Sequence, residues 1–280
     1  MRVDSHVHFW HYDEQEYDWI SDGMEVLQQD YLPGHVARTL NRNGLDGCVA
    51  VQARQSELET HFLVELAKSN EIIKGVVGWI DLRDEKLEER LQYFSQYSQI
   101  KGWRHVVQGE PDDFLLRKDF QRGIQALQPF GYTYDVLIYH HQLKPALEFV
   151  SLFPEQKFVI DHCAKPDIRA KSIDAWKVHM KEMAKHPNVS CKISGLLTET
   201  RWKQWSPADF YPYLDVVFEA FGTDRILYGS DWPVVLLSGI YVQWRSLIDK
   251  YMENIEEEEK EKVMGENAVS FYGLDKAGAI

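Results

Sequence analysis

Residues 133–163 read TYDVLIYHHQLKPALEFVSLFPEQKFVIDHC, and this stretch decides the fold. It contains two short runs, 133–139 and 157–163, that are rich in the apolar and aromatic residues that favour β-strands. Residues 141–154 between them have the apolar spacing of an amphipathic helix, with a proline just beyond its last turn. A strand, a helix and a second strand in this order predict two parallel strands joined by a right-handed crossover.

The same unit recurs through the whole chain. The apolar runs that predict strands are residues 2–9, 46–52, 73–81, 100–107, 133–139, 157–163, 188–195 and 225–231. The stretches between them that predict helices include residues 32–44, 57–70, 87–99, 120–131, 141–154 and 173–187. Eight units of about 35 residues match an α/β protein whose single domain, residues 1–280, is a (β/α)8 barrel. The site of such a barrel lies at the C-terminal ends of its strands. A doubly wound open sheet is the alternative, which the lack of a G-x-G-x-x-G motif after the first run disfavours.

Composition narrows the class of protein. The net charge of −13 disfavours nucleic acid and anionic membranes as partners, and the 44% hydrophobic content is ample for a large core. No apolar run reaches the roughly 18 residues of a membrane span, and the chain enters its first strand with no room for a signal peptide. The three cysteines, without C-x-x-C spacing, predict buried thiols in a reducing, cytoplasmic compartment. The acidic run 254–263 predicts the solvated face of a late helix. The sequence does not predict the oligomeric state, and a homodimer is one of the open alternatives.

Polar side chains gather where the predicted strands end. His6 and His8 are two positions apart in the first run, so their side chains point the same way. The other polar residues at the strand ends are Gln52, Arg54, Arg104, His105, His140, His141, His162, Lys192, Asp231 and Trp232. One histidine in such a place is commonly a hydrogen-bonded core residue. Histidine or a lone aspartate at five of eight strand ends is instead typical of a catalytic site.

This set of residues has the parts for hydrolysis. Imidazoles and a carboxylate suit one Zn²⁺ or a similar divalent ion with water in an open position. A carboxylate near that water can take its proton, and Arg54, Arg104 and Lys192 could hold an acidic or polyhydroxylated substrate. Alternatively, His6, His8 and His162 could polarise a carbonyl group directly, without a metal.

Four motifs resemble the amidohydrolase superfamily, and within it the amidohydrolase-2 group of sugar-acid lactonases, which includes L-fuconolactonases and L-rhamnonolactonases. The motifs are DSHVHFW (4–10), GWRHVVQ (102–108), DHCAKP (161–166) and GSDWP (229–233). The resemblance implies a hydrolase of carbohydrate catabolism that opens the lactone ring of a small-molecule sugar acid. It places the catalytic residues, which would also hold a metal, at His6, His8, His162 and Asp231, with Asp231 activating the water. Predicted contacts to substrate come from Gln52, Arg54, Arg104, His105, His140, Lys192 and Trp232.

One departure from the superfamily limits the metal. Metal-rich branches use a carboxylated lysine or a glutamate at the fourth strand to bridge two ions, whereas this chain has Arg104 and His105 there. An arginine cannot ligate a cation, so we predict one metal at most. Similar lactonases and pyrone hydrolases include members that work without metal, and both cases stay open.

Other functions and the role of two loops also stay open. Related barrels decarboxylate aromatic or enol acids with a similar set of residues, which makes decarboxylation the alternative to lactone hydrolysis. A catalytically dead scaffold is disfavoured because Asp231 and both histidines of the first strand are present. The aromatic-rich loops 10–24 and 196–210 are expected at the same face, either to stack on a sugar ring or only to pack.

Overall fold

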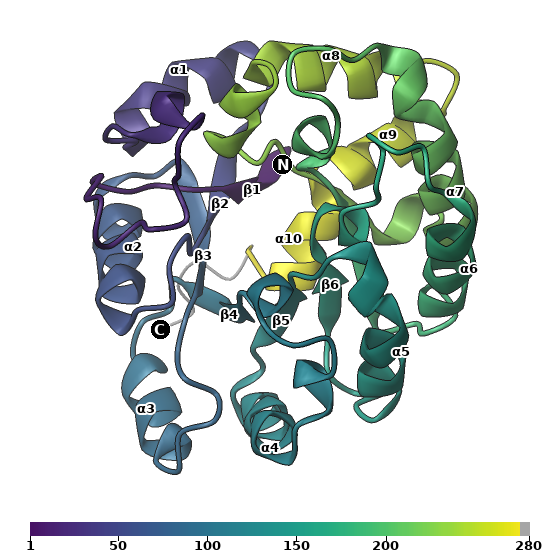
Figure 1. The fold of residues 1–280 in the computed structure, drawn as a ribbon. Coiled ribbons are helices and arrows are strands. Elements are labelled where there is room, and N and C mark those ends of the chain that lie inside the picture. The colour runs from purple at the N-terminus through teal and green to yellow at the C-terminus, as the bar shows by residue number, and fades with distance from the viewer. Residues whose placement is uncertain (275–280) are drawn as a thin grey trace.

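Eight parallel strands form a closed barrel in the computed structural model, which describes residues 1–274 (Figure 1). The strands follow one another around the sheet in chain order: β1 (Val3–Val7), β2 (Gly47–Val51), β3 (Ile73–Gly78), β4 (Ile100–His105), β5 (Thr133–Val136), β6 (Phe158–Ile160), β7 (Val189–Ile193) and β8 (Ile226–Tyr228). The backbone nitrogen of His8 donates to the carbonyl of Trp232 at 2.7 Å, and that of Asp231 donates to the carbonyl of His6 at 2.9 Å. These bonds join the two ends of the sheet, which confirms the predicted (β/α)8 barrel over the open sheet.

Helices surround the barrel, and the last of them covers one of its ends, as Figure 1 shows. They are α1 (Pro33–Arg42), α2 (Glu57–Ser69), α3 (Leu87–Phe94), α4 (Lys118–Leu127), α5 (Leu143–Ser151), α6 (Asp174–Met183), α7 (Tyr211–Phe221), α8 (Tyr241–Tyr251), α9 (Glu257–Glu261) and α10 (Asn267–Tyr272). Every helix expected from the amphipathic stretches is present, although α3 ends at Phe94, five residues before the predicted end at residue 99. There the chain leaves the helix through a turn in which Tyr97 N donates to Phe94 O at 3.0 Å.

The last helix closes one end of the barrel. Ala268, Val269 and Tyr272 of α10 pack with inward-facing residues of the strands, among them Val3 and Val159. In Figure 1, α10 crosses the middle of the ring of strands. The barrel is therefore plugged at the end opposite the expected site, which leaves the C-terminal ends of the strands as its open side.

Several smaller expectations have a clear outcome. The acidic run forms α9, in which Glu257, Glu258 and Glu259 are exposed, as predicted. Cys48, Cys163 and Cys191 are buried and free, also as predicted. Between residues 1 and 274, no helix has the length and apolar character to cross a membrane. The predicted domain over residues 1–280 extends to 275–280, which lie outside the described residues.

Candidate active site

Two histidines and one aspartate converge at the C-terminal end of the barrel. His6 lies on β1 and His8 follows its last residue, and their Nε2 atoms are 3.1 Å apart, as expected from the alternation of side chains along a strand. Asp231, beyond the end of β8, has its Oδ1 atom 3.3 Å from His8 Nε2 and 3.8 Å from His6 Nε2. All three side chains are almost completely buried. They form one compact, buried cluster, and two of its members, His8 and Asp231, line a cavity.

Burial sets the charges in this cluster. It lowers the pKa of His6 and His8, so both imidazoles are neutral at neutral pH. Burial alone would raise the pKa of Asp231, but His162 and the two other histidines outweigh it and hold that pKa below its usual range. The cluster therefore presents an anionic carboxylate beside neutral imidazoles, which suits a general base.

The imidazole of His8 is held in one tautomer. Its Nδ1 atom lies 2.7 Å from the carbonyl oxygen of Val51. A carbonyl oxygen only accepts hydrogen bonds, so the proton of a neutral His8 is on Nδ1 and the lone pair of Nε2 faces Asp231 and His6.

His162 joins the cluster from the segment after β6. Its Nε2 atom is 4.0 Å from Asp231 Oδ1, and its Nδ1 atom is 2.8 Å from the hydroxyl of Ser194. Burial lowers the pKa of His162 to about 4, so this ring is also neutral. The predicted strand 157–163 ends earlier, at Ile160, because His162 and Cys163 have φ values of 53° and 52°, in the left-handed region. His162 thus lies on a tight turn rather than on the strand.

We expect Gly195→Ala to displace the ring of His162. Gly195 has φ +64°, and a Cβ atom there would lie 2.5 Å from His162 Nδ1. We expect kcat/KM to fall by about 10-fold or more, because a small misplacement of a catalytic group has a large effect on rate. Gly131→Ala is the matched control, since Gly131 has φ +70° and nothing within 4 Å of its would-be Cβ. Both variants carry the backbone strain, so equal activities would show that His162 does not depend on the space at Gly195.

A network of buried charges lies directly beneath the cluster. Arg104 Nη1 donates to Asp161 Oδ2 at 3.0 Å and lies 3.2 Å from His6 Nε2. Lys192 Nζ is 2.5 Å from Asp135 Oδ2, 2.9 Å from Asp161 Oδ1 and 3.2 Å from His6 Nδ1. Two cations and two carboxylates compensate one another in a region with almost no access to water. The network fixes the position of His6 from below.

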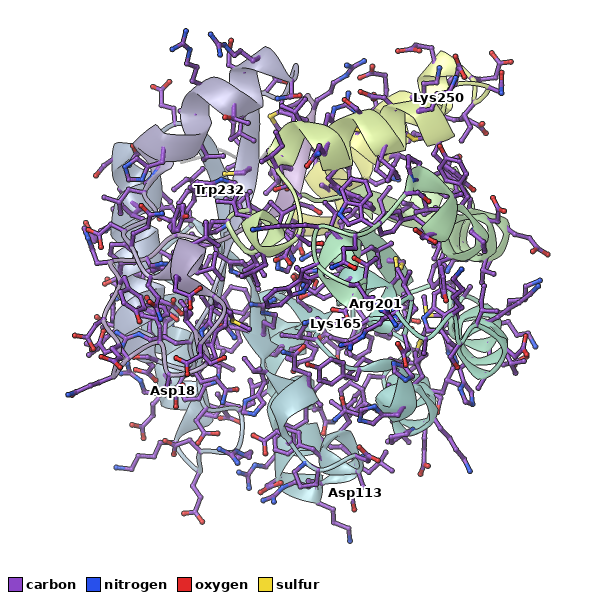
Figure 2. The ribbon with its side chains drawn as sticks, turned by 45° about the horizontal axis from the view of Figure 1, so that its top comes forward. Asp18, Asp113, Lys165, Arg201, Trp232 and Lys250 are labelled. Atoms are coloured by element: carbon purple, nitrogen blue, oxygen red, sulfur yellow. The ribbon has the colours of Figure 1, made fainter. Side chains whose placement is uncertain are left out.

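A cavity of about 540 Å³ opens above the cluster, a volume that suits a small-molecule ligand. Of the predicted site residues, His8, Arg54, Arg104, His162 and Asp231 line it. The other lining residues are Gln15, Glu16, Asp18, Trp19, Ala53, Gln55, Ser56, Val106, Gln108, Leu137, Lys165 and Val234. Figure 2 labels Lys165 near the middle of the molecule and Asp18 on the side formed by the first loop.

Five predicted substrate contacts are not among the described residues that line this cavity. Lys192 is fully buried in the charge network, and Gln52 is buried with its amide donating to the carbonyl of Arg104 at 3.0 Å. His105 stacks on Phe114 with ring centroids 4.8 Å apart, on the helix side of the barrel wall. His140 Nδ1 is 3.0 Å from the carbonyl oxygen of Lys165. Trp232 packs on Tyr31 with ring centroids 5.1 Å apart. Their contact with substrate stays a prediction, and their observed positions favour supporting roles.

The two aromatic-rich loops differ in position. Loop 10–24 brings Trp19 to the cavity, whereas none of the described residues of loop 196–210 lines it. Trp202 and Trp205 of the second loop instead donate to the backbone, to Thr198 O at 3.0 Å and to Ser238 O at 2.8 Å. Stacking on a substrate therefore stays a prediction for Trp19 of the first loop, whereas the contacts of the second loop agree with packing.

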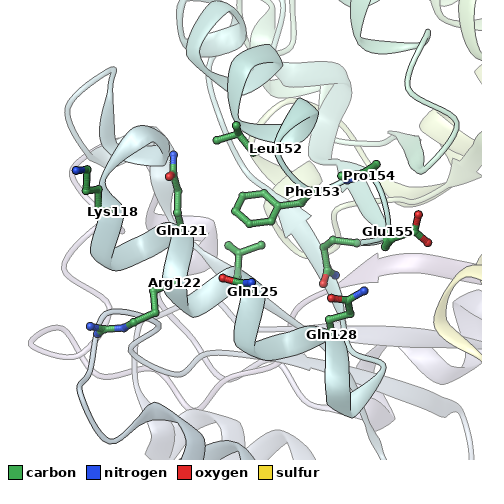
Figure 3. A pocket seen from close by; sticks show the side chains of 11 residues that line it. Lys118, Gln121, Arg122, Gln125, Gln128, Leu152, Phe153, Pro154 and Glu155 are labelled. Carbon is green, nitrogen blue, oxygen red and sulfur yellow. The ribbon is translucent and has the colours of Figure 1, made fainter.

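A second cavity of about 460 Å³ lies on the outside of the barrel, between α4 and the segment after α5 (Figure 3). Lys118 and Gln121 lie on its α4 side, and Phe153 lies on the other. Among the described residues that line it there is no histidine, and Glu155 is the one carboxylate. It therefore lacks the groups for the chemistry expected of this chain.

The donor atoms of the cluster fit one metal ion. In a tetrahedral zinc site, bonds of about 2.0–2.2 Å place the ligand atoms about 3.3–3.6 Å apart. The distances among His6 Nε2, His8 Nε2 and Asp231 Oδ1 are 3.1, 3.3 and 3.8 Å. His6 would ligate through Nε2 with its Nδ1 proton directed at Asp161 Oδ1, 3.5 Å away. Arg104 Nη1 lies 3.2 Å from the same Nε2 atom, so this contact would have to be given up when a metal binds there.

The sequence also matches a known family. The family model Amidohydro_2, described as amidohydrolase, matches residues 3–274. The chain belongs to this family. The amidohydrolase is 37% identical over 286 residues to a Burkholderia multivorans protein named L-fucono-1,5-lactonase, covering 98% of this chain and 96% of that protein. It is 30% identical to a protein of the same name from Burkholderia ambifaria, covering 99% and 97% of the two chains.

A solved structure agrees with the fold of this amidohydrolase. A crystal structure of an amidohydrolase from Burkholderia multivorans with bound zinc superposes with a TM-score of 0.94 at 37% identity, covering 98% of this chain and 99% of that one. The resemblance expected from the four motifs is thereby confirmed at the level of the family.

Several residues that support the site of this amidohydrolase were not predicted from the sequence. Asp135 and Asp161 belong to the charge network, and Asp4 accepts hydrogen bonds from Ser230 N at 2.9 Å and Tyr241 OH at 2.9 Å. Each of these aspartates lies in or at the end of an apolar run, and a charged residue in such a run is the signal that could have identified them. Lys165 lines the cavity and was contained in the DHCAKP motif.

Proposed function

We propose that this amidohydrolase is a lactonase that opens the ring of a sugar-acid lactone, an aldonolactone such as L-fuconolactone or L-rhamnonolactone. The observation that carries the proposal is the anionic Asp231 beside neutral His8 and His162 in a cavity large enough for a sugar ring. The 37% and 30% identity to two proteins named L-fucono-1,5-lactonase supports this class of substrate over an aromatic or enol acid that is decarboxylated.

The cluster supplies the proton transfers of this reaction. Asp231 takes a proton from a water molecule as the water oxygen attacks the lactone carbonyl carbon. With its Nδ1 atom accepting from the hydroxyl of Ser194, the neutral ring of His162 can donate from Nε2 to the former carbonyl oxygen and stabilise its negative charge. The bond from the carbonyl carbon to the ring oxygen then breaks, and Asp231 returns its proton to the leaving alkoxide. The product is a hydroxy acid that ionises at neutral pH, so each turnover releases one proton.

A panel of aldonolactones tests the proposed function. A pH indicator follows the proton released on ring opening, and we expect turnover of sugar-acid lactones and none of simple alkyl esters of similar size. Aromatic acids are added to the panel with a measurement of released carbon dioxide. Carbon dioxide release without any lactone hydrolysis would replace lactonase by decarboxylase.

We further propose that His6, His8 and Asp231 hold one zinc ion, which would supply a Lewis acid beside the cavity when bound. The donor distances and the relative solved with bound zinc support this. We expect emission spectroscopy to find about one zinc per chain, and removal by a chelator to lower kcat/KM by about 10²-fold, restored by added zinc.

Two variants control the assignment of the metal. His8→Ala is expected to lose the zinc, whereas His141→Ala is expected to keep it, because His141 is exposed and lies 3.3 Å from Asp112. Full activity of the metal-free protein would show that the imidazoles polarise the carbonyl group by themselves.

A further inference from the structure

The turn after β6 has an unusual backbone. His162, Cys163, Ala164 and Lys165 have φ values of 53°, 52°, 57° and 45°, so four successive residues other than glycine are left-handed. This conformation is unfavourable for residues other than glycine, so it forms only where contacts hold it. Trp176 Nε1 donates to Cys163 O at 2.7 Å, and Cys163 Sγ donates to Lys192 O at 3.3 Å.

The turn directs two functional side chains to the same place. Cys163 and Ala164 are fully buried, whereas His162 and Lys165 both line the cavity. Residues three apart in a helical turn lie on the same side of it. The hydrogen bond from Lys165 N to His162 O, at 2.8 Å, closes the turn. The strained backbone thus delivers an imidazole and an ammonium group to one cavity.

Lys165 differs from the other cations of the cavity. Arg54 is paired with Glu16 at 2.7 Å, and Arg104 with Asp161 at 3.0 Å. For Lys165, no carboxylate oxygen of residues 1–274 lies within ion-pair distance. Its Nζ atom is instead 5.4 Å from the centre of the Tyr139 ring. The charge of Lys165 opposes the burial that raises the pKa of Glu199, but the two side chains form no ion pair. The ammonium group of Lys165 can therefore still bind an anionic ligand in the cavity.

We propose that Lys165 binds the negative charge that forms at the lactone carbonyl and remains on the carboxylate of the product. The inference rests on the proposed function. A lactone is neutral, so an ammonium group beside its carbonyl binds the transition state and the product more strongly than the substrate. Lys165 then contributes to kcat and also makes the ionised hydroxy acid an inhibitor.

Lys165→Met and Lys165→Arg test this role. We expect Lys165→Met to lower kcat by about 10²-fold with a small change in KM, and Lys165→Arg to restore part of the rate. The inhibition constant of the aldonate product is expected to rise by about 10-fold or more in Lys165→Met, because a charge-assisted hydrogen bond is lost. Binding of the corresponding alditol, which has the hydroxyl groups without the carboxylate, should stay the same.

Lys118→Met is the matched control. Lys118 is an exposed lysine at the second cavity, on the outside of the barrel (Figure 3), and its replacement should change none of these constants. If Lys165→Met weakened the binding of aldonate and alditol equally, the lysine would have a structural role and the inference would be overturned. An unchanged inhibition constant of the aldonate would overturn it too. A wild-type protein that hydrolyses no lactone of the panel would instead refute the proposed function. That result is distinguishable from the two results on Lys165→Met that overturn the inference.

Discussion

Asp231→Asn is expected to abolish turnover while leaving the fold intact. The carboxylate of Asp231 is anionic because the surrounding imidazoles hold its pKa below the usual range, and an amide cannot take the proton of the attacking water. It also lies 3.3 Å from His8 Nε2 and lines the cavity in which we propose that the lactone binds. We expect kcat to fall by about 10³-fold or more, since proton transfer and placement of the water are lost together.

The measurement is the initial rate on the preferred lactone, with circular dichroism and thermal unfolding of the same sample. Asp113→Asn is the control, because Asp113 is exposed and lies at the edge of the molecule in Figure 2. A rate of Asp231→Asn near that of the control would contradict the assignment of Asp231 as the base. Because Asp231 N donates to His6 O through the backbone, that link between β1 and β8 persists in the variant.

The barrel was predictable because its signal is local. Each strand is a short apolar run, each helix between them is amphipathic, and regular alternation leaves few topologies. The convergence of His6 and His8 was also predictable, since two positions in one strand fix the direction of both side chains. The meeting of these residues with His162 and Asp231 followed from the rule that polar groups at the C-terminal strand ends of a barrel face one site.

Depth within the barrel was not predictable. Lys192 and Gln52 lie at strand ends in the sequence, but the register between neighbouring strands places them below the cavity, in contact with Asp135 and Arg104. The left-handed turn that carries Lys165 depends on its contacts with Trp176 and β7, which are distant in the chain. Such features arise from tertiary contacts, so the local spacing of apolar residues does not predict them.

Lys192→Met is expected to lower the free energy of unfolding by about 3–5 kcal/mol, the usual cost of removing one partner of a buried ion pair. Lys192 is fully buried, and its ammonium group lies 2.5 Å from Asp135 and 2.9 Å from Asp161. Burial already raises the pKa of Asp135 to about 6, even with Lys192 beside it. Without the lysine, two buried carboxyl groups would face each other, and Tyr272 of the plugging helix would lose a well-placed acceptor.

Urea unfolding of the variant, alone and combined with Asp135→Asn, distinguishes this structural role from the predicted contact with substrate. Asp161 keeps its ion pair with Arg104, whereas Asp135 loses its cation in Lys192→Met. The double variant removes the charge of Asp135, so we expect it to be more stable than Lys192→Met alone. Lys118→Met serves again as the exposed control and should change stability by less than about 0.5 kcal/mol. If Lys192 instead contacted the substrate, Lys192→Met would raise KM and leave the urea midpoint near that of the control. The short distances from Lys192 to both aspartates favour the loss of stability.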